Sequence, residues 1–305
     1  MRGAALAALV AGALLAGCGR EEAPSAVVIA FTPRDDAGRL IARADILDVT
    51  LAVDGVPVAG AWELVQRDEP VAVAVAVQEL DDDAAHEQAW RGAERVLEGL
   101  RDGVDWSTLY VVHGDVEQRL APWSRDRLAA RSAIGHVGGP PSEAVSRLVP
   151  ILRRLARDFE ENDDALPRRR LAVVVTDGRE RLAARPGVLA KHVEKIAEMA
   201  RSSGFTIDVV VAAPRSSPEA ATASALAAAS GGVVHVVEDL GGDALVAALA
   251  ASGAVARGEL ELRFTPTPGA EPARSGPYDA DVTCRTRDGR SHRWRFEGLK
   301  RPARP

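Results

Sequence analysis

Residues 71–77 read Val-Ala-Val-Ala-Val-Ala-Val, an apolar run without a charge. Such a run is typical of a strand that is buried on both faces of a parallel sheet. Residues 171–175, Leu-Ala-Val-Val-Val, have the same character. Shorter apolar segments predict further strands over residues 109–112, 116–120, 205–211 and 233–237.

The segments between these strands have helical spacing, because apolar residues recur in them at intervals of three and four. Helices are predicted over residues 84–101, 141–159, 188–200, 218–229 and 243–251. Parallel strands need long crossovers, which helices supply. Residues 68–252 therefore predict an α/β domain with a doubly wound, mostly parallel sheet.

The flanks of this domain have strand character instead. A β-rich lead-in, residues 27–67, has a hairpin signal at Asp54-Gly55, with one strand predicted over 56–65. A β-rich C-terminal extension, residues 253–305, has predicted strands at 260–265, 280–286 and 292–296. Neither flank is long enough to bury a core alone, so we expect the two to pack together.

The N-terminus predicts export. A positive start is followed by about 13 apolar residues, too few to span a bilayer. They end in Leu15-Ala16-Gly17-Cys18, which resembles the lipobox of bacterial lipoproteins, although an ordinary signal peptide with a chance cysteine is the alternative. The resemblance implies a signal peptide over residues 1–18, lipid attachment at Cys18, a polar tether over 19–26 and a membrane-anchored protein of the cell envelope. Gly19 stands where an inner-membrane retention signal has Asp, which favours the outer membrane, on its periplasmic or surface face.

Composition excludes several classes of function. The net charge of −6 and the lack of a basic stripe argue against a nucleic-acid partner. Two cysteines, Cys18 and Cys284, cannot form a disulfide framework or a cysteine-based zinc site. The sequence has no H-E-x-x-H, G-x-S-x-G or G-x-G-x-x-G motif, so we expect no enzyme and no dinucleotide cofactor. An α/β enzyme remains an alternative, and it requires a nucleophile–base pair at the strand ends.

Ligands of open α/β sheets bind beyond the carboxyl ends of the strands. Three loops are candidates for this ligand-binding position, and they comprise residues 78–83, 138–142 and 176–179. The strand predicted over residues 171–175 begins after three arginines. We predict that these residues, Arg168, Arg169 and Arg170, form the solvated end of a loop.

At these loops the sequence resembles the von Willebrand factor type A (VWA) family. Residues 173–178, Val-Val-Val-Thr-Asp-Gly, resemble its strand followed by Thr-Asp-Gly, and residues 138–141, Gly-Gly-Pro-Pro, resemble its Gly-Gly-Thr-Pro segment. Residues 110–120, 203–209 and 229–232 follow in the family's order. The resemblance covers about residues 68–252 and implies the VWA fold, with protein binding as its function.

This sequence departs from the ligand pattern of the family's metal-ion-dependent adhesion site. That site holds Mg²⁺ through Asp-x-Ser-x-Ser, a Thr and an Asp. Gln78 stands at the first Asp, Leu80 and Asp82 stand at the two Ser positions, and Pro140 replaces the Thr. Only Asp177 keeps its place, so the resemblance implies a degenerate site and no standard cofactor.

Two interpretations of the acidic residues remain open. A rearranged site of Asp81, Asp83 and Asp177 would bind a divalent cation, Ca²⁺ or Mg²⁺, for metal-dependent adhesion. Alternatively, residues 81–83 only cap the following helix.

The function expected is binding of a partner protein of the cell envelope without the standard Mg²⁺. The partner-binding rim is predicted to consist of Gln78, Glu79, Pro140, Ser142 and Gly178.

Overall fold

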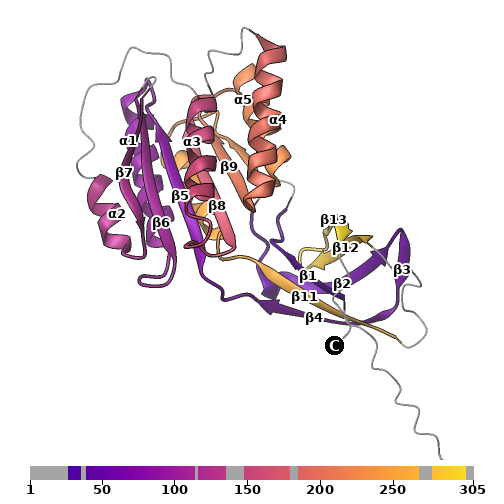
Figure 1. Ribbon diagram of the computed structural model, residues 1–305. Coiled ribbons are helices and arrows are strands. Elements are labelled where there is room, and N and C mark those ends of the chain that lie inside the picture. Colours follow the sequence, from indigo (N-terminus) through magenta and orange to yellow (C-terminus); the bar gives the residue numbers. More distant parts are fainter. Residues whose placement is uncertain are drawn as a thin grey trace, which may run out of the picture.

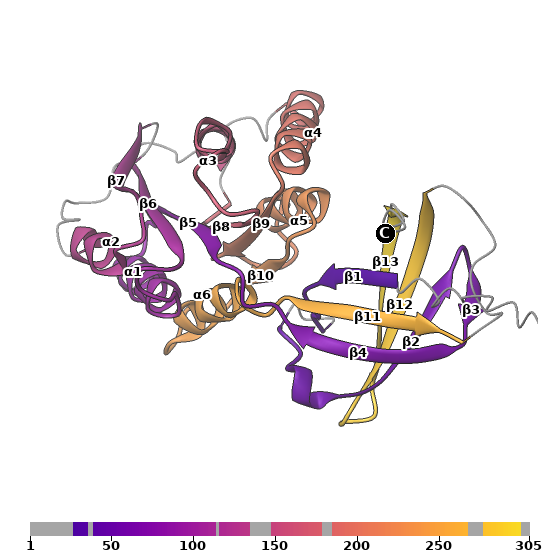
Figure 2. The ribbon, with the colours of Figure 1, turned by 60° about the horizontal axis from the view of Figure 1, so that its bottom comes forward.

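The computed structural model describes residues 27–35, 39–113, 116–134, 148–178, 185–267 and 277–299. These residues form an α/β unit and a β-sandwich that is built from both flanks (Figure 1, Figure 2). The predicted signal peptide 1–18, with Cys18, and the tether 19–26 lie outside the described residues.

A six-stranded sheet forms the centre of the α/β unit, in the order β10-β9-β8-β5-β6-β7. Its strands are β5 (Val71–Gln78), β6 (Trp106–His113), β7 (Val116–Ser124), β8 (Arg169–Thr176), β9 (Phe205–Val211) and β10 (Val234–Val236). Neighbouring strands are parallel except for β6 and β7. The order reverses between β5 and β8, which is the switch point of a doubly wound sheet. The predicted fold class is confirmed.

Helices cover both faces of this sheet (Figure 2). One face packs against α1 (Asp83–Glu98), α2 (Arg127–Ile134) and α6 (Ala244–Val255). The other packs against α3 (Leu148–Glu161), α4 (Pro186–Ser202) and α5 (Pro218–Ser230). None of the described helices combines the length and the apolar character that crossing a membrane requires.

The alternation of Val and Ala along β5 matches these two faces. Its valines belong to the core with α1 and α6, and its alanines belong to the core with α3. Every residue of β5 is buried, as a central parallel strand requires.

Helix α2 was not predicted from the sequence. It has eight residues, and beside the buried Ala130 its Ala133 and Ile134 pack against the core, but it is shorter than the window of about 11–18 residues over which helical periodicity is read. Its start is fixed by Asp126, whose carboxylate accepts hydrogen bonds from the N–H groups of Leu128 and Ala129. Residues 141–147 of the helix predicted over 141–159 lie outside the described residues, and α3 is described from Leu148.

The β-sandwich consists of two sheets with one shared core. The first has the order β1 (Val27–Phe31), β11 (Leu260–Pro266), β4 (Gly60–Gln66), and the second has the order β13 (Ser291–Leu299), β12 (Tyr278–Thr286), β2 (Ile46–Val53), β3 (Val56–Val58). A short 3-10 helix, Arg43–Asp45, precedes β2. Tail strand β11 lies between lead-in strands β1 and β4, and β12 pairs with β2. The two flanks therefore pack together, as predicted.

One strand prediction in the lead-in is wrong. The strand expected over residues 56–65 is divided at Ala59 into β3 and β4, which belong to different sheets. Gly60 permits this crossing, because a Cβ there would lie 2.3 Å from the carbonyl oxygen of Thr265. The hairpin between β2 and β3 is present, with Asp54 and Gly55 both at positive φ.

Candidate functional site

The carboxyl ends of β5 and β8 meet in a buried hydrogen-bonded junction. Gln78 ends β5 and is 1% exposed, and Thr176 ends β8 beside it. The Thr176 hydroxyl donates to the Gln78 side-chain oxygen, and Gln78 Nε2 donates to Asp177 Oδ1 at 2.8 Å. One amide therefore holds the ends of both central strands together.

Gly178 completes this junction. Its N–H donates to Thr176 Oγ1 at 2.7 Å, and its φ is +77°. A Cβ at this position would lie 2.5 Å from Cβ of Glu219, at the start of α5. Glycine is therefore required both by the backbone conformation and by the close approach of α5.

The acidic residues after β5 have different environments. Asp81, Asp82 and Asp83 are all exposed. Asp82 is the N-cap of α1, where its Oδ1 accepts a hydrogen bond from the N–H of Ala85 at 2.7 Å. The capping interpretation is confirmed for Asp82, while the roles predicted for Asp81 and Asp83 stay predictions.

The remaining predicted site residues are only partly described. Glu79 is buried, and its backbone N–H donates to the Val112 carbonyl oxygen at 3.0 Å, which extends the pairing of β5 with β6. Pro140, Ser142 and Cys18 lie outside the described residues.

The oxygen donors described at the strand ends do not fit Mg²⁺, which requires six oxygens at about 2.1 Å. The Gln78 oxygen accepts from Thr176, and Gln78 turns an N–H group, not an oxygen, toward Asp177. Within the described ranges, no group of three or more His, Cys, Asp or Glu side chains is arranged to hold a metal ion. The carboxylate set Asp81, Asp83 and Asp177 stays a prediction.

The hydrogen bonds around the junction also bear on nucleophilic chemistry. The Thr176 hydroxyl donates to an amide, which is not a base. His86 of α1 accepts a hydrogen bond from the indole of Trp90 at 3.0 Å through its Nε2. Among the described strand-end residues, these contacts give no hydroxyl–imidazole pair.

A buried ion pair between the two units was not predicted. Arg34, from the segment after β1, contacts both carboxylate oxygens of Asp208 at 3.1 Å. Asp208 lies within β9 and is fully buried, and it also accepts from the N–H of Val233 at 2.9 Å. Burial raises the pKa of Asp208 against the opposing effect of Arg34. The available signal was a single acid inside the apolar strand Phe-Thr-Ile-Asp-Val-Val-Val.

The prediction of a solvated loop end at residues 168–170 is wrong for two of its three arginines. Arg170 is buried and pairs with Asp163 at 2.5 Å, and it also donates to the Ser203 carbonyl oxygen at 3.0 Å. The Arg169 side chain is 10% exposed and pairs with Glu259 at 2.9 Å. Arg168 alone is exposed. Arg169 is held by Glu259, which directly precedes β11, whereas Arg170 is enclosed by the loop between α3 and β8 and by the end of α4.

These features define a class of fold. A sheet wound outward from β5 and β8, with an antiparallel edge strand β7 and helices on both faces, is a VWA-like fold. The sequence motifs predicted this fold.

Comparisons with known proteins found similar solved structures. No protein-family description and no curated protein matches the sequence. A von Willebrand factor type A structure from Catenulispora acidiphila is 13% identical, with a TM-score of 0.49, over 90% of this chain and 73% of that chain. The conserved hypothetical protein BatB from Bacteroides thetaiotaomicron is 16% identical, with a TM-score of 0.43, over 60% of this chain and 96% of its own. The SpRpn10 VWA domain is 10% identical, with a TM-score of 0.42, over 55% of this chain and 88% of that chain.

Proposed function

We propose that this protein is a non-enzymatic binding module of the bacterial cell envelope, which binds a partner protein at the carboxyl ends of β5 and β8 without the standard Mg²⁺. The observation that carries the proposal is the bridge from Gln78 to Thr176 and Asp177. In the metal-dependent arrangement of the VWA family, the residues at the positions of Gln78 and Asp177 point oxygens at a cation. Here they are hydrogen-bonded to one another.

This bridge favours direct binding of a protein surface. A junction held by side-chain hydrogen bonds is rigid before the partner arrives, so less conformational freedom is lost on association. The exposed carboxylates of Asp81 and Asp83 lie at the start of α1, next to the junction, and give this surface a negative charge. Such charges set orientation and association rate more than affinity.

Anchoring is the second part of the proposal. The Leu-Ala-Gly-Cys sequence ending at Cys18 supports attachment of acyl chains to that thiol. Each buried methylene contributes about 0.8 kcal/mol, so two or three chains hold a protein firmly at a membrane. Gly19 favours the outer membrane.

Affinity capture from envelope extracts tests the binding site. The full-length protein in mild detergent is compared with an Asp81→Asn/Asp83→Asn variant, and a Glu160→Gln/Glu161→Gln variant is the matched control. Glu160 and Glu161 are exposed at the end of α3, and their substitution removes the same charge. We expect the captured protein to be lost or reduced only with the first variant, and to be retained in EDTA.

Two results would contradict the proposal. Equal capture by both variants would place the binding surface elsewhere. Release of the partner by EDTA, with recovery on adding Ca²⁺ or Mg²⁺, would favour metal-dependent adhesion through the acidic residues.

A further inference from the structure

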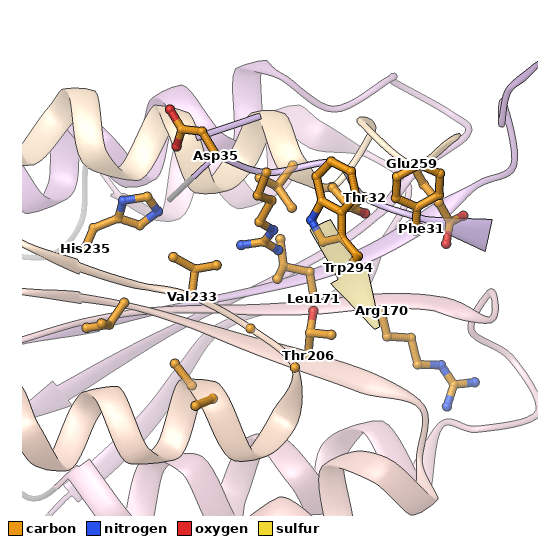
Figure 3. A pocket seen from close by; sticks show the side chains of 18 of the residues that line it. Phe31, Thr32, Asp35, Arg170, Leu171, Thr206, Val233, His235, Glu259 and Trp294 are labelled. Atoms are coloured by element: carbon orange, nitrogen blue, oxygen red, sulfur yellow. The ribbon is translucent and has the colours of Figure 1, made fainter. Parts of the chain in front are cut away.

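A pocket of about 1710 Å³ lies between the α/β unit and the β-sandwich (Figure 3). Its lining includes Val71 and Arg169, which begin β5 and β8, whereas the strand-end junction lies at the carboxyl ends of these strands. One wall is the edge of the central sheet, which includes Val233 and His235. Another wall comes from the β-sandwich, with Phe31 and Trp294. Neither the VWA-type motifs nor the proposed function accounts for this pocket.

The sheet edge in this pocket is strand β10. It pairs with β9 alone among the described strands, and all residues from 231 to 237 line the pocket. The Val233 carbonyl accepts from Val209, and the Val237 N–H donates to Val211, so these residues turn their peptide groups toward β9. Because peptide groups alternate along a strand, those of Val234 and Val236 point the other way, toward the open edge. An open edge of this kind is a template for another strand.

His235 adds a polar group on the same strand. Its Nε2 is buried and has no hydrogen-bond partner within the described part of the chain. Burial also lowers the pKa of His235, because the charged imidazolium loses its hydration there. A buried polar atom of this kind needs a partner, and a ligand in the pocket can supply one.

The sandwich wall of the pocket is aromatic. Trp294 and Phe296 lie on β13, which is the edge strand of its own sheet. Both pack against Phe31, with ring centroids 5.3 and 6.1 Å apart, and both remain partly exposed. This wall can accept apolar side chains.

The charge of the lining is positive although the whole chain has a net charge of −6. Eight arginines line the pocket against three carboxylates. Arg168 and Arg215 are exposed, and neither has an ion pair among the described residues. Arg293 and Arg295 have carboxylate partners, yet their side chains are 66% and 58% exposed. These four arginines can still meet a negatively charged ligand.

We propose that this pocket binds an extended acidic segment of a partner protein, which adds as a strand to the open edge of β10. Peptide groups of Val234 and Val236 provide the backbone hydrogen bonds. Apolar side chains of the segment pack against Trp294 and Phe296, and its carboxylates face Arg168 and Arg215. This second site is independent of the strand-end junction.

Fluorescence anisotropy tests the proposal with a labelled ten-residue peptide of alternating valine and glutamate and the full-length protein in mild detergent. We expect saturable binding that weakens with salt, because exposed charges are screened. An Arg168→Glu/Arg215→Glu variant is expected to bind at least about tenfold more weakly, since both charges are reversed at the site. Arg157→Glu, an exposed position of α3 outside the pocket lining, is the control and leaves the affinity unchanged.

A second peptide separates strand addition from simple charge attraction. It has the same sequence, with alternate peptide nitrogens methylated so that one edge cannot donate hydrogen bonds. We expect its affinity to fall at least about tenfold, because strand addition depends on main-chain hydrogen bonds. Asp81→Asn/Asp83→Asn leaves the binding of the first peptide unchanged, which distinguishes this site from the strand-end surface.

Several results would overturn the proposal. They are equal binding of the methylated peptide, equal binding of a valine–lysine peptide, or no binding of the acidic peptide at all. Tighter binding of anionic lipid vesicles or of single-stranded DNA would assign the arginines to another ligand. A dimer in light scattering that the Arg168→Glu/Arg215→Glu variant dissociates would show that a second copy of the chain occupies the edge.

Discussion

Replacement of Arg34 by alanine is expected to destabilise the protein by about 3 kcal/mol at pH 7. The structure sets this magnitude, because Asp208 is fully buried and the Arg34 side chain is only 12% exposed. Breaking a buried pair by removing one partner costs about 3–5 kcal/mol, since a charge is left uncompensated. We take the lower end of this range because some water can reach the guanidinium position.

The loss depends on pH in a defined direction. Burial already raises the pKa of Asp208, and removal of Arg34 raises it further by deleting the opposing positive charge. A carboxyl group whose pKa is raised in the folded state stabilises the fold fully at a pH below its unfolded-state pKa of about 3.9. This stabilisation is lost as the pH rises through the folded-state pKa. The defect of Arg34→Ala is therefore smaller at pH 5 than at pH 8.

Urea unfolding followed by tryptophan fluorescence measures the effect. Arg39→Ala is the matched control from the same segment, because the Arg39 side chain is 67% exposed in its pair with Asp35 and such pairs contribute at most about 1 kcal/mol. Adding Asp208→Asn to Arg34→Ala removes the unpaired charge and restores part of the stability. A loss below about 1 kcal/mol, or a defect that is the same at pH 5 and pH 8, would refute the argument.

Further predictions concern three other positions. Gly178→Ala is expected to lower the free energy of unfolding by about 1–3 kcal/mol, because Gly178 has a positive φ and a Cβ there would lie 2.5 Å from Glu219. Gly187→Ala is the control and is expected to be neutral or stabilising, because no atom lies within 4 Å of a Cβ at that position. Thermal unfolding compares the two variants, and equal effects would contradict this account. Burial raises the pKa of Cys284 to about 12, so its thiol is expected to resist a thiol-specific reagent at pH 8 until urea unfolds the protein, and rapid labelling of the native state would contradict its burial. The same shift predicts that this group's contribution to stability is lost as the pH rises above the unfolded thiol value of about 8.5. Cys18→Ser is expected to leave the protein unprocessed or soluble in the periplasm, and a variant that still fractionates as a lipid-modified membrane protein would disprove the lipobox assignment.

Much of the α/β unit could be predicted because its signals are local. The Val-Ala alternation of β5 and the three- and four-residue spacing of Ala89, Ala93 and Val96 along α1 indicate directly which side chains are buried. The strand expected over 205–211 has the observed bounds of β9. Helix α2 was not predicted because its eight residues are too few for the window of about 11–18 residues over which helical periodicity is read.

The long-range features could not be predicted in this way. Whether Arg34 is solvated or paired depends on Asp208, 174 positions away in the chain. The division of the 56–65 strand likewise depends on how closely Gly60 approaches the tail strand β11. At the candidate site, the sequence indicated that Gln78 and Asp177 are near one another, but the direction of the amide became clear only from the contact with Thr176.

Isothermal titration of the full-length protein with Mg²⁺, Ca²⁺ and Mn²⁺ tests the central claim that the strand-end junction works through hydrogen-bonded side chains. The account predicts no binding at micromolar concentrations, either in the natural protein or after Asp177→Ala. A dissociation constant near or below 1 μM, equivalent to about −8.2 kcal/mol, that Asp177→Ala abolishes would contradict it.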